Sequence, residues 1–330
     1  MSELAGSSIL LTGGTGSFGT AFIGHALRRL SPRRLVVLSR DELKQYEVRR
    51  RFGDDARVRF FLGDVRDRRR LARAMHDVDH VVHAAALKQV DTGEYNPFEF
   101  VATNVSGSQQ VIEAAIDAGV RKVVALSTDK ASSPINLYGA TKLCADRMFI
   151  SANHYAAAHR TRFAVVRYGN VMASRGSVIP HFRALAERGE SLPITHKDMT
   201  RFWITLDRAV RFVVDSFDAM RGGELFVPRI PSMRLVDLAQ AVAPGSPMHE
   251  VGVRPGEKLH EEMIAADDAR RTVRLDDRYV VQPHLAGWGY RPPEDGVAVP
   301  EGFSYRSDTN DLWLTRDEIA DLIAGTGEAS

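Results

Sequence analysis

The stretch Ser8-Ile-Leu-Leu-Thr-Gly-Gly-Thr-Gly-Ser-Phe-Gly19 decides the fold of this chain. The apolar run at residues 8–11 predicts a buried strand, and the helical apolar spacing after the stretch predicts a helix. Between them, Gly13, Gly16 and Gly19 let the backbone turn tightly and approach a pyrophosphate at the positive end of that helix. The order of strand, glycines and helix therefore predicts a dinucleotide site.

From this stretch to about residue 172, predicted strands and helices alternate regularly. Short apolar strands alternate with longer amphipathic helices, which is typical of an α/β fold with a doubly wound parallel sheet of the Rossmann type. We predict helices at residues 97–118 and from residue 138 to about residue 159. We predict the strands at residues 8–11, 34–38, 58–62, 79–83, 121–127 and 163–168.

The character of the chain changes after residue 172, where prolines and glycines become frequent and segments shorten. We predict a dinucleotide-binding domain over residues 1–172, to which part of 197–227 returns. Residues 173–330 are predicted to form mainly a smaller, substrate-binding lobe. Because ligands of such sheets bind at the carboxyl ends of the strands, we expect the site in a cleft between the two lobes.

The end of the second strand bears on the identity of the dinucleotide. NAD-specific folds usually place an acidic residue there to hold the ribose 2′-hydroxyl, whereas an arginine suits a 2′-phosphate. Arg40 takes this place between Ser39 and Asp41, and Lys44 follows one turn later, so we predict NADP. The alternative is that Arg40 and Lys44 are ordinary exposed charges at a helix start.

Two further segments border the same predicted site. Asp64 and Val65 follow the third strand, where they are suitably placed to meet the adenine edge. Ala84 and Ala85 follow the fourth strand, and their small side chains let the cofactor approach the backbone. Both segments are therefore predicted cofactor contacts.

Tyr138-Gly-Ala-Thr-Lys142 places a phenol and an ammonium one turn apart on one helix face. The ammonium is expected to lower the pKa of the phenol from about 10, so that the tyrosinate accepts a hydroxyl proton near neutral pH. Shortly upstream, Asp129 and Lys130 add a carboxyl and an amine. A simple alcohol dehydrogenase does not need this second acid/base pair, whereas an enzyme that oxidises, eliminates and then reduces does.

Composition is that of an ordinary globular protein, with 330 residues and a formal net charge of +2. No apolar run approaches the roughly 18 residues needed to span a bilayer, and the N-terminus lacks a basic-then-apolar signal pattern. We therefore expect a cytoplasmic protein without a membrane partner. Cys144, the single cysteine, excludes an internal disulfide and is predicted to be a buried core residue rather than a nucleophile.

Basic clusters such as residues 49–51 and 66–70 raise the question of a nucleic-acid partner. Acidic residues nearly balance them and no aromatic stripe accompanies them, so we interpret them as solvated helix faces. The histidines show no ligand grouping, and no metal is predicted.

The glycine motif, Thr128, Tyr138 and Lys142 together resemble the extended short-chain dehydrogenase/reductase superfamily. Finer motifs, over about residues 7–320, resemble the inverting UDP-N-acetylglucosamine 4,6-dehydratases of bacterial pseudaminic acid and related sugar pathways. Those motifs are Ser39-Arg-Asp-Glu-Leu-Lys44, Ala84-Ala-Ala-Leu-Lys88, Ser127-Thr-Asp-Lys130, Asn136-Leu-Tyr-Gly-Ala-Thr-Lys142, Arg167-Tyr-Gly-Asn170, Thr200-Arg-Phe-Trp203 and Arg254-Pro-Gly-Glu-Lys258.

The resemblance implies roles for single residues and, commonly, a homo-oligomer. Thr128, Tyr138 and Lys142 would handle the C4 hydroxyl, and Asp129 and Lys130 the elimination. The implied nucleotide-sugar site comprises Lys88, Asn170, Arg175, Arg201 and Arg254, with surface ion pairing as the alternative for Arg201 and Arg254. The implied cofactor site comprises Gly13, Thr15, Gly16, Ser17, Phe18, Gly19, Ser39, Arg40, Asp41, Lys44, Asp64, Val65, Ala84, Ala85, Tyr138, Lys142 and Val171.

The implied reaction forms a 4-keto-6-deoxy sugar through transient oxidation at C4 by bound NADP. Lys130 would remove the C5 hydrogen, Asp129 would protonate the departing C6 hydroxyl, and a proton would return to C5 from the opposite face. Retaining dehydratases typically have Asp-Glu at this place, so the lysine favours inversion. As a base, Lys130 needs a depressed pKa, which we expect from burial near other cations.

The chain departs from the family pattern beside the predicted sugar pocket, so another hexose, a heptose or another nucleotide is an open alternative. A nucleotide-sugar 4-epimerase would use Thr128, Tyr138 and Lys142 but would not need Asp129 and Lys130. A non-catalytic NADP-binding regulator would usually lose the tyrosine or the lysine. The departing residues are Gln89, Asp91, Thr92, Gly93, Met172 and Ala173.

Overall fold

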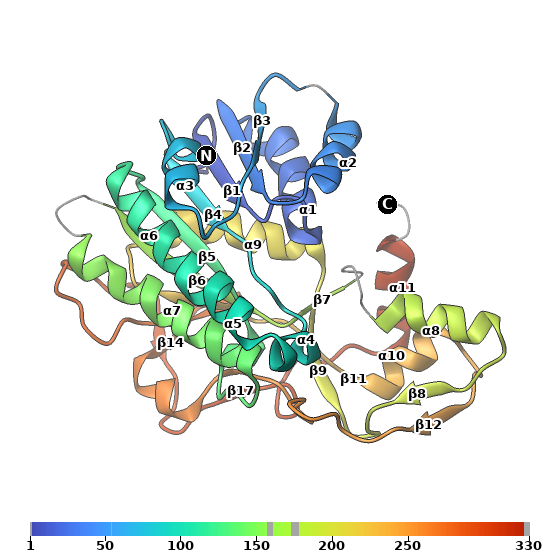
Figure 1. The fold of residues 1–330 in the computed structure, drawn as a ribbon. Coiled ribbons are helices and arrows are strands. Elements are labelled where there is room, and N and C mark those ends of the chain that lie inside the picture. The colour runs from blue at the N-terminus through green and yellow to red at the C-terminus, as the bar shows by residue number, and fades with distance from the viewer. Residues whose placement is uncertain (1, 54, 157–160, 173–177, 327–330) are drawn as a thin grey trace.

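The computed structural model describes residues 2–53, 55–156, 161–172 and 178–326. A ten-stranded sheet runs through the centre of the protein in the order β16-β14-β15-β10-β6-β5-β4-β1-β2-β3 (Figure 1). Its strands are β1 (Ser8–Thr12), β2 (Arg34–Ser39), β3 (Val58–Leu62), β4 (His80–His83), β5 (Lys122–Thr128), β6 (Arg162–Tyr168), β10 (Leu225–Pro228), β14 (Thr272–Arg274), β15 (Arg278–Val281) and β16 (Val297–Ala298).

The strands from β10 to β3 are parallel, and β1 lies between β2 and β4. The prediction of a doubly wound parallel α/β sheet is confirmed, and each of the six predicted strands ends within one residue of its observed bounds. The antiparallel strands β15, β14 and β16 continue the sheet beyond β10. The sequence analysis did not predict this continuation.

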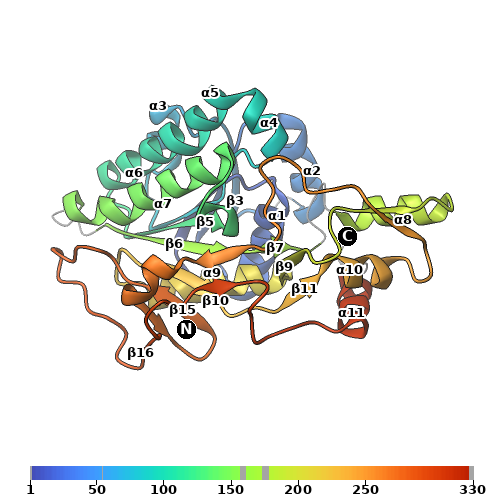
Figure 2. The same ribbon diagram turned by 90° about the horizontal axis from the view of Figure 1, so that it is seen from below.

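Helices cover both faces of the sheet. Helices α3, α6 and α7 lie on one face, and α9 packs beside α1 on the other (Figure 2). The helical elements up to α9 are α1 (Ser17–His25), the π-helix η1 (Ala26–Leu30), α2 (Glu42–Phe52), α3 (Arg68–Ala74), α4 (Val90–Tyr95), α5 (Pro97–Phe100), the π-helix η2 (Val101–Ser106), α6 (Gly107–Asp117), the 3-10 turn η3 (Asp129–Ala131), α7 (Leu137–Tyr155), α8 (Val178–Glu187) and α9 (Leu206–Ala219).

A second hydrophobic cluster forms beside the sheet, where α8 and α11 pack against α10 (Figure 1). Its centre includes Phe182, Trp203 and Leu238, all buried. The remaining elements are β7 (Asn170–Val171), β8 (Leu192–Ile194), β9 (Thr200–Ile204), β11 (Ser232–Arg234), α10 (Leu235–Val242), β12 (Met248–Glu250), β13 (Glu262–Ile264), the 3-10 helix η5 (Ala266–Arg271), β17 (Tyr305–Arg306) and α11 (Arg316–Thr326).

Helix α7 begins with a side-chain cap, because Asn136 Oδ1 accepts the backbone N–H of Gly139 at 2.7 Å. Its buried face includes Tyr138, Lys142 and Phe149, which recur at helical spacing. Cys144 falls off this face and is exposed. The prediction that Cys144 is a buried core residue was therefore wrong.

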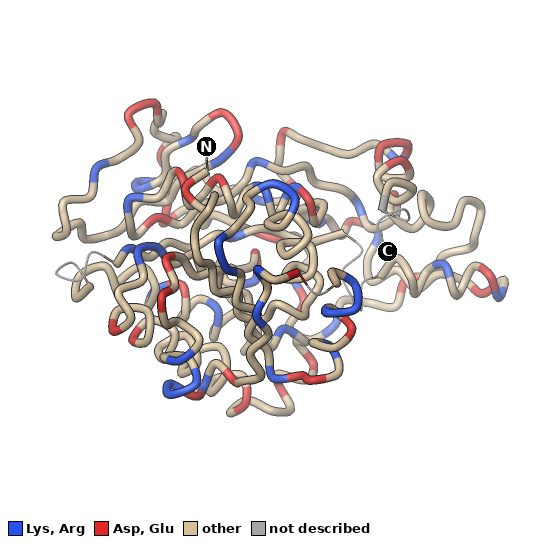
Figure 3. The backbone as a smooth tube through the Cα atoms, turned by 90° about the horizontal axis from the view of Figure 1, so that it is seen from above, with Lys and Arg blue, Asp and Glu red and all other residues tan. Residues whose placement is uncertain are grey.

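Charged residues of both signs are interspersed around the fold (Figure 3). Within the described ranges, no helix combines the length and the apolar character that crossing a bilayer requires.

A buried ion pair ties α7 to the sheet. Asp146 Oδ2 accepts hydrogen bonds from Arg167 Nη2 at 3.0 Å and from Ser127 Oγ at 2.7 Å, while Arg167 Nη1 donates to the carbonyl of Met263 at 2.9 Å. The side chains of Asp146 and Arg167 are only 3% and 4% exposed. The pair therefore joins α7 to β5, β6 and β13.

We predict that Asp146→Ala lowers the free energy of unfolding by about 3–5 kcal/mol, because it leaves the Arg167 guanidinium buried without its counter-ion. Urea unfolding of the two proteins measures the difference. Asp237→Ala is the matched control, since Asp237 pairs with Arg316 at 3.0 Å on the surface and such pairs contribute about 0–1 kcal/mol. Equal losses in both variants would contradict the prediction.

Candidate functional site

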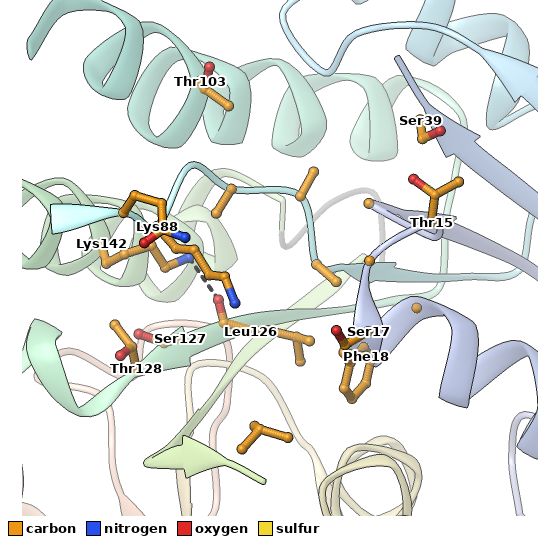
Figure 4. Close-up of a pocket in the computed structure, with 18 of the residues that line it drawn as sticks. Thr15, Ser17, Phe18, Ser39, Lys88, Thr103, Leu126, Ser127, Thr128 and Lys142 are labelled. Carbon is orange, nitrogen blue, oxygen red and sulfur yellow. Dashed lines mark hydrogen bonds between the residues drawn. The ribbon is translucent and has the colours of Figure 1, made fainter. Parts of the chain in front are cut away.

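A cavity of about 880 Å³ lies at the carboxyl ends of the parallel strands, where the strand order reverses beside β1. Every residue predicted to bind the cofactor lines this cavity, as do all five predicted catalytic residues. Figure 4 shows Thr15, Ser17 and Phe18 of the glycine-rich turn together with Lys142 and its hydrogen bond to Leu126.

The turn after β1 brings two backbone segments unusually close. Gly13 has φ +67°, and a Cβ built on it would lie 2.8 Å from the carbonyl carbon and oxygen of Ala84 and from the amide nitrogen of Ala85. Helix α1 begins at Ser17, so its free N–H groups and positive end point into the cavity. This geometry fits the pyrophosphate of a dinucleotide.

Thr12 fixes the backbone of Ala84 and Ala85, the segment that faces Gly13 across the turn. The sequence analysis did not predict this role. Its Oγ1 lies 2.8 Å from His83 Nδ1 and accepts the backbone N–H groups of Ala84 at 3.2 Å and Ala85 at 3.3 Å. A buried threonine inside an apolar strand is the only local signal for this role, and it is a weak one.

Both cations at the end of β2 already have carboxylate partners. Lys44 Nζ lies 2.9 Å from Asp41 Oδ2, and Arg40 Nη1 lies 3.7 Å from Asp64 Oδ2. Asp64 is also held by Arg66 at 2.8 Å. About half of each cationic side chain is exposed, at 52% for Arg40 and 49% for Lys44. An anion in the cavity can therefore reach both, in competition with Asp41 and Asp64.

The Tyr138 and Lys142 pair differs electrostatically from the expectation. Desolvation raises the pKa of Tyr138 to about 12, although the Lys130 charge and the Thr128 hydroxyl act to lower it. The Lys142 ammonium instead donates to the carbonyl of Leu126 at 2.7 Å. We expected Lys142 to lower the pKa of Tyr138 towards neutrality. This expectation was wrong, because desolvation of the buried phenol raises its pKa more than the neighbouring groups lower it.

Lys130 sits between two buried carboxylates. Its Nζ lies 3.2 Å from Asp129 Oδ1 and 3.0 Å from Glu261 Oε1. Desolvation lowers the pKa of Lys130, but Asp129 and Glu261 outweigh it and hold the pKa above its ordinary value. The expected depression of this pKa by neighbouring cations was also wrong. The sequence analysis missed Glu261 because it stands 131 residues from Lys130, and the only signal for it was the acidic pair that follows Arg254-Pro-Gly-Glu-Lys258.

The predicted nucleotide-sugar residues are only partly brought together. Lys88 and Asn170 line the cavity. Desolvation lowers the pKa of Lys88, and Asn104 fixes the preceding residue by bonding both the N–H and the carbonyl of Leu87, at 2.9 Å and 3.0 Å. Arg175 lies outside the described residues.

Arg201 and Arg254 are absent from the described lining of the cavity. Arg254 is exposed. Arg201 is buried, with Nη2 3.0 Å from Glu257 Oε1 and Nε 3.7 Å from Glu261 Oε1. Its guanidinium is therefore already paired with carboxylates, but in a buried ion pair and not in the surface ion pair that was the alternative for this residue.

The residues that depart from the family pattern do not all lie at the cavity. Gln89 lines the cavity, whereas Met172 is buried in the second hydrophobic cluster. Asp91, Thr92 and Gly93 belong to α4, and Ala173 lies outside the described residues. Among the described residues, no group of three or more His, Cys, Asp or Glu side chains is arranged to hold a metal ion.

Comparison with known proteins agrees with this geometry. The family model described as polysaccharide biosynthesis protein matches residues 9–283. The UDP-N-acetylglucosamine 4,6-dehydratase (inverting) of Campylobacter jejuni strain 81-176 is 48% identical over 329 residues, which cover 97% of this chain and 98% of the relative.

Two solved structures are similar over most of the chain. Pen from Bacillus thuringiensis has a TM-score of 0.90 at 35% identity, covering 98% of this chain and 99% of its own. The dTDP-glucose 4,6-dehydratase DesIV of Streptomyces venezuelae, solved with NAD bound, has a TM-score of 0.68 at 27% identity, covering 76% of this chain and 86% of its own. Together with the cavity, these similarities identify a nicotinamide dinucleotide as the cofactor.

We predict that Gly13→Ala weakens dinucleotide binding about tenfold to a hundredfold, because strain of about 1–3 kcal/mol is added at the turn that receives the pyrophosphate. Isothermal titration with the cofactor measures the affinity. Gly6→Ala is the matched control, since Gly6 has a nearly identical φ of +66° but nothing within 4 Å of the added Cβ. Unchanged affinity in Gly13→Ala would disprove the assigned approach of the cofactor.

Proposed function

We propose that this chain, which belongs to the polysaccharide biosynthesis protein family and to the extended short-chain dehydrogenases/reductases, is an inverting nucleotide-sugar 4,6-dehydratase. The observation that carries the proposal is the cluster of two acid/base sets at one end of the dinucleotide cavity: Tyr138 with Lys142, and Asp129 with Lys130. UDP-N-acetylglucosamine or a related nucleotide sugar is the proposed substrate.

We propose NADP as the cofactor in preference to NAD. The support for this choice is that Arg40 and Lys44 line the cavity beside Ser39, at the end of β2. A 2′-phosphate is a stronger partner for two cations than a ribose hydroxyl is. When bound, the dinucleotide would supply reversible hydride transfer to and from the sugar. Gly13 and the N-terminus of α1 would hold the pyrophosphate.

Tyr138 is the group proposed to exchange the proton of the C4 hydroxyl. Because burial holds the phenol neutral, its deprotonated form depends on the nearby Lys130 charge and on the Thr128 hydroxyl, both of which lower the Tyr138 pKa. Lys142, anchored on the Leu126 carbonyl, would orient the nicotinamide ribose. These residues alone would serve a 4-epimerase equally well.

Asp129 and Lys130 distinguish the dehydratase from the epimerase. Once C4 is a ketone, the C5 hydrogen is acidic, so a base at C5 and an acid at the C6 hydroxyl suffice to expel water. We assign these tasks to Lys130 and Asp129, which lie side by side on the turn after β5. Return of a proton from the opposite face inverts C5.

We predict that Arg40→Asp weakens NADP binding about a hundredfold while changing NAD binding far less, because the new carboxylate repels a 2′-phosphate but accepts a ribose hydroxyl. Titration of the purified protein with each dinucleotide measures both affinities. Equal losses for the two cofactors would remove Arg40 from the 2′-phosphate site.

We predict that the protein converts UDP-N-acetylglucosamine or a related nucleotide sugar to a 4-keto-6-deoxy product inverted at C5, without net consumption of the cofactor. In deuterated water, one solvent deuterium should enter at C5, while the hydrogen gained at C6 should come from C4 of the substrate. Mass spectrometry and NMR of early product measure both. Epimerisation at C4 without loss of water would establish the epimerase instead, and retention at C5 would refute the role of Lys130 in inversion.

A further inference from the structure

His83 is a buried histidine near the cofactor cavity, and the proposed mechanism does not use it. It is the last residue of β4, is only 1% exposed and is absent from the described lining of the cavity. Its Nδ1 lies 2.8 Å from Thr12 Oγ1. That oxygen accepts the backbone N–H groups of Ala84 at 3.2 Å and of Ala85 at 3.3 Å. A series of hydrogen bonds therefore runs from His83 through Thr12 to a segment that does line the cavity.

The direction of the bond between His83 and Thr12 follows from the number of protons and lone pairs. The oxygen of a threonine hydroxyl has two lone pairs and carries one proton. The N–H groups of Ala84 and Ala85 occupy both lone pairs, so Thr12 Oγ1 cannot accept a third donor. His83 Nδ1 is then the acceptor, and the Thr12 hydroxyl donates its proton to it.

Two further observations agree with a neutral imidazole that accepts through Nδ1. Desolvation lowers the pKa of His83 to about 3, and the charge of Lys142 acts in the same direction. The proton of the neutral ring is therefore on Nε2, which is buried and has no hydrogen-bond partner in the described part of the chain. An unpaired buried N–H is unfavourable, so packing alone does not explain a histidine here.

The Ala85 N–H depends on this arrangement more than the Ala84 N–H does. The Ala84 N–H also reaches the carbonyl of Thr12 at 3.2 Å, whereas Thr12 Oγ1 is the acceptor that the described residues offer to the Ala85 N–H. The segment has little room to move, because a Cβ on Gly13 would lie 2.8 Å from the Ala84 carbonyl and from the Ala85 nitrogen. A Thr12 hydroxyl that turned its proton towards the Ala85 N–H would displace this segment.

We propose that His83 is a positioning residue for the cofactor. By accepting the proton of the Thr12 hydroxyl, it keeps both lone pairs of that oxygen directed at Ala84 and Ala85. It thereby fixes the wall that faces Gly13 across the dinucleotide turn. The inference rests on the dinucleotide site and deepens the proposed function, because hydride transfer requires a cofactor that is held in one orientation.

His80 provides a comparison within the same strand. It is 0% exposed, and desolvation lowers its pKa to about 4, so it is also buried and neutral. Neither of its ring nitrogens has a hydrogen-bond partner in the described residues, and its ring meets the edge of Phe217 at 5.7 Å between centroids. His80 and His83 therefore share strand, residue type and burial, but of the two only His83 is bonded to the wall of the cofactor turn.

Isothermal titration with the cofactor tests the inference without any sugar substrate. We expect His83→Phe, which keeps a ring but has no acceptor, to weaken dinucleotide binding about tenfold, as the loss of one uncharged hydrogen bond does. His83→Asn keeps an acceptor near the place of Nδ1 and should recover most of the affinity. His80→Phe is the matched control and should leave the affinity unchanged.

A double-mutant cycle separates positioning through Thr12 from a merely structural effect. Thr12→Val nearly keeps the shape of the side chain but removes the hydroxyl, so it should weaken binding at least as much as His83→Phe does. If His83 acts through that hydroxyl, adding His83→Phe to Thr12→Val should weaken binding no further. A packing defect at residue 83 would instead multiply the loss caused by Thr12→Val.

Unchanged affinity in His83→Phe, or multiplied losses in the double variant, would overturn the inference. If His83→Phe does not fold, His83→Asn carries the test: affinity close to that of the wild type supports the role as acceptor, and a tenfold loss contradicts it. A protein that binds the dinucleotide normally but never releases water from any nucleotide sugar would instead refute the proposed function, so the two failures are distinguishable.

Discussion

The buried ion pair between Asp146 and Arg167 connects the three parts of the chain on which the site depends. Helix α7 carries Tyr138, strand β5 ends at the turn that carries Lys130, and β13 follows Glu261. Hydrogen bonds from Ser127 and to the carbonyl of Met263 extend the pair to β5 and β13. Since both charges are desolvated, each requires the other, and the three elements are held in one arrangement.

The parts of the fold that follow from local pattern were predictable. Apolar runs such as residues 8–11 and 34–38 predict buried parallel strands, because both faces of the sheet are covered by helices. The spacing of the glycines predicted the position of the cofactor turn, because only a residue without a Cβ permits the close approach of Gly13 to Ala84. Such signals lie within one segment of the sequence.

The electrostatics of the site could not be predicted, because they arise between distant segments. The pKa of Lys130 depends on Glu261, which no spacing rule connects to it. The pKa of Tyr138 depends on how deeply the cavity wall is buried, which a Tyr-x-x-x-Lys pattern does not reveal. Cys144 was misplaced for a simpler reason, since its neighbours on α7 are buried but its own position lies off the buried face.

The hydrogen bonds between Glu261 and Ser307 have a consequence for the order in which the protein is made. The proposed catalytic residues, from Thr128 to Lys142, belong to the first half of the chain and leave the ribosome early during translation. Glu261 reaches its final place only after Ser307 has left the ribosome. The ion pair between Lys130 and Glu261 can therefore close only after most of the chain has been made, and β17, the last strand in the sequence, pairs with β13 beside it.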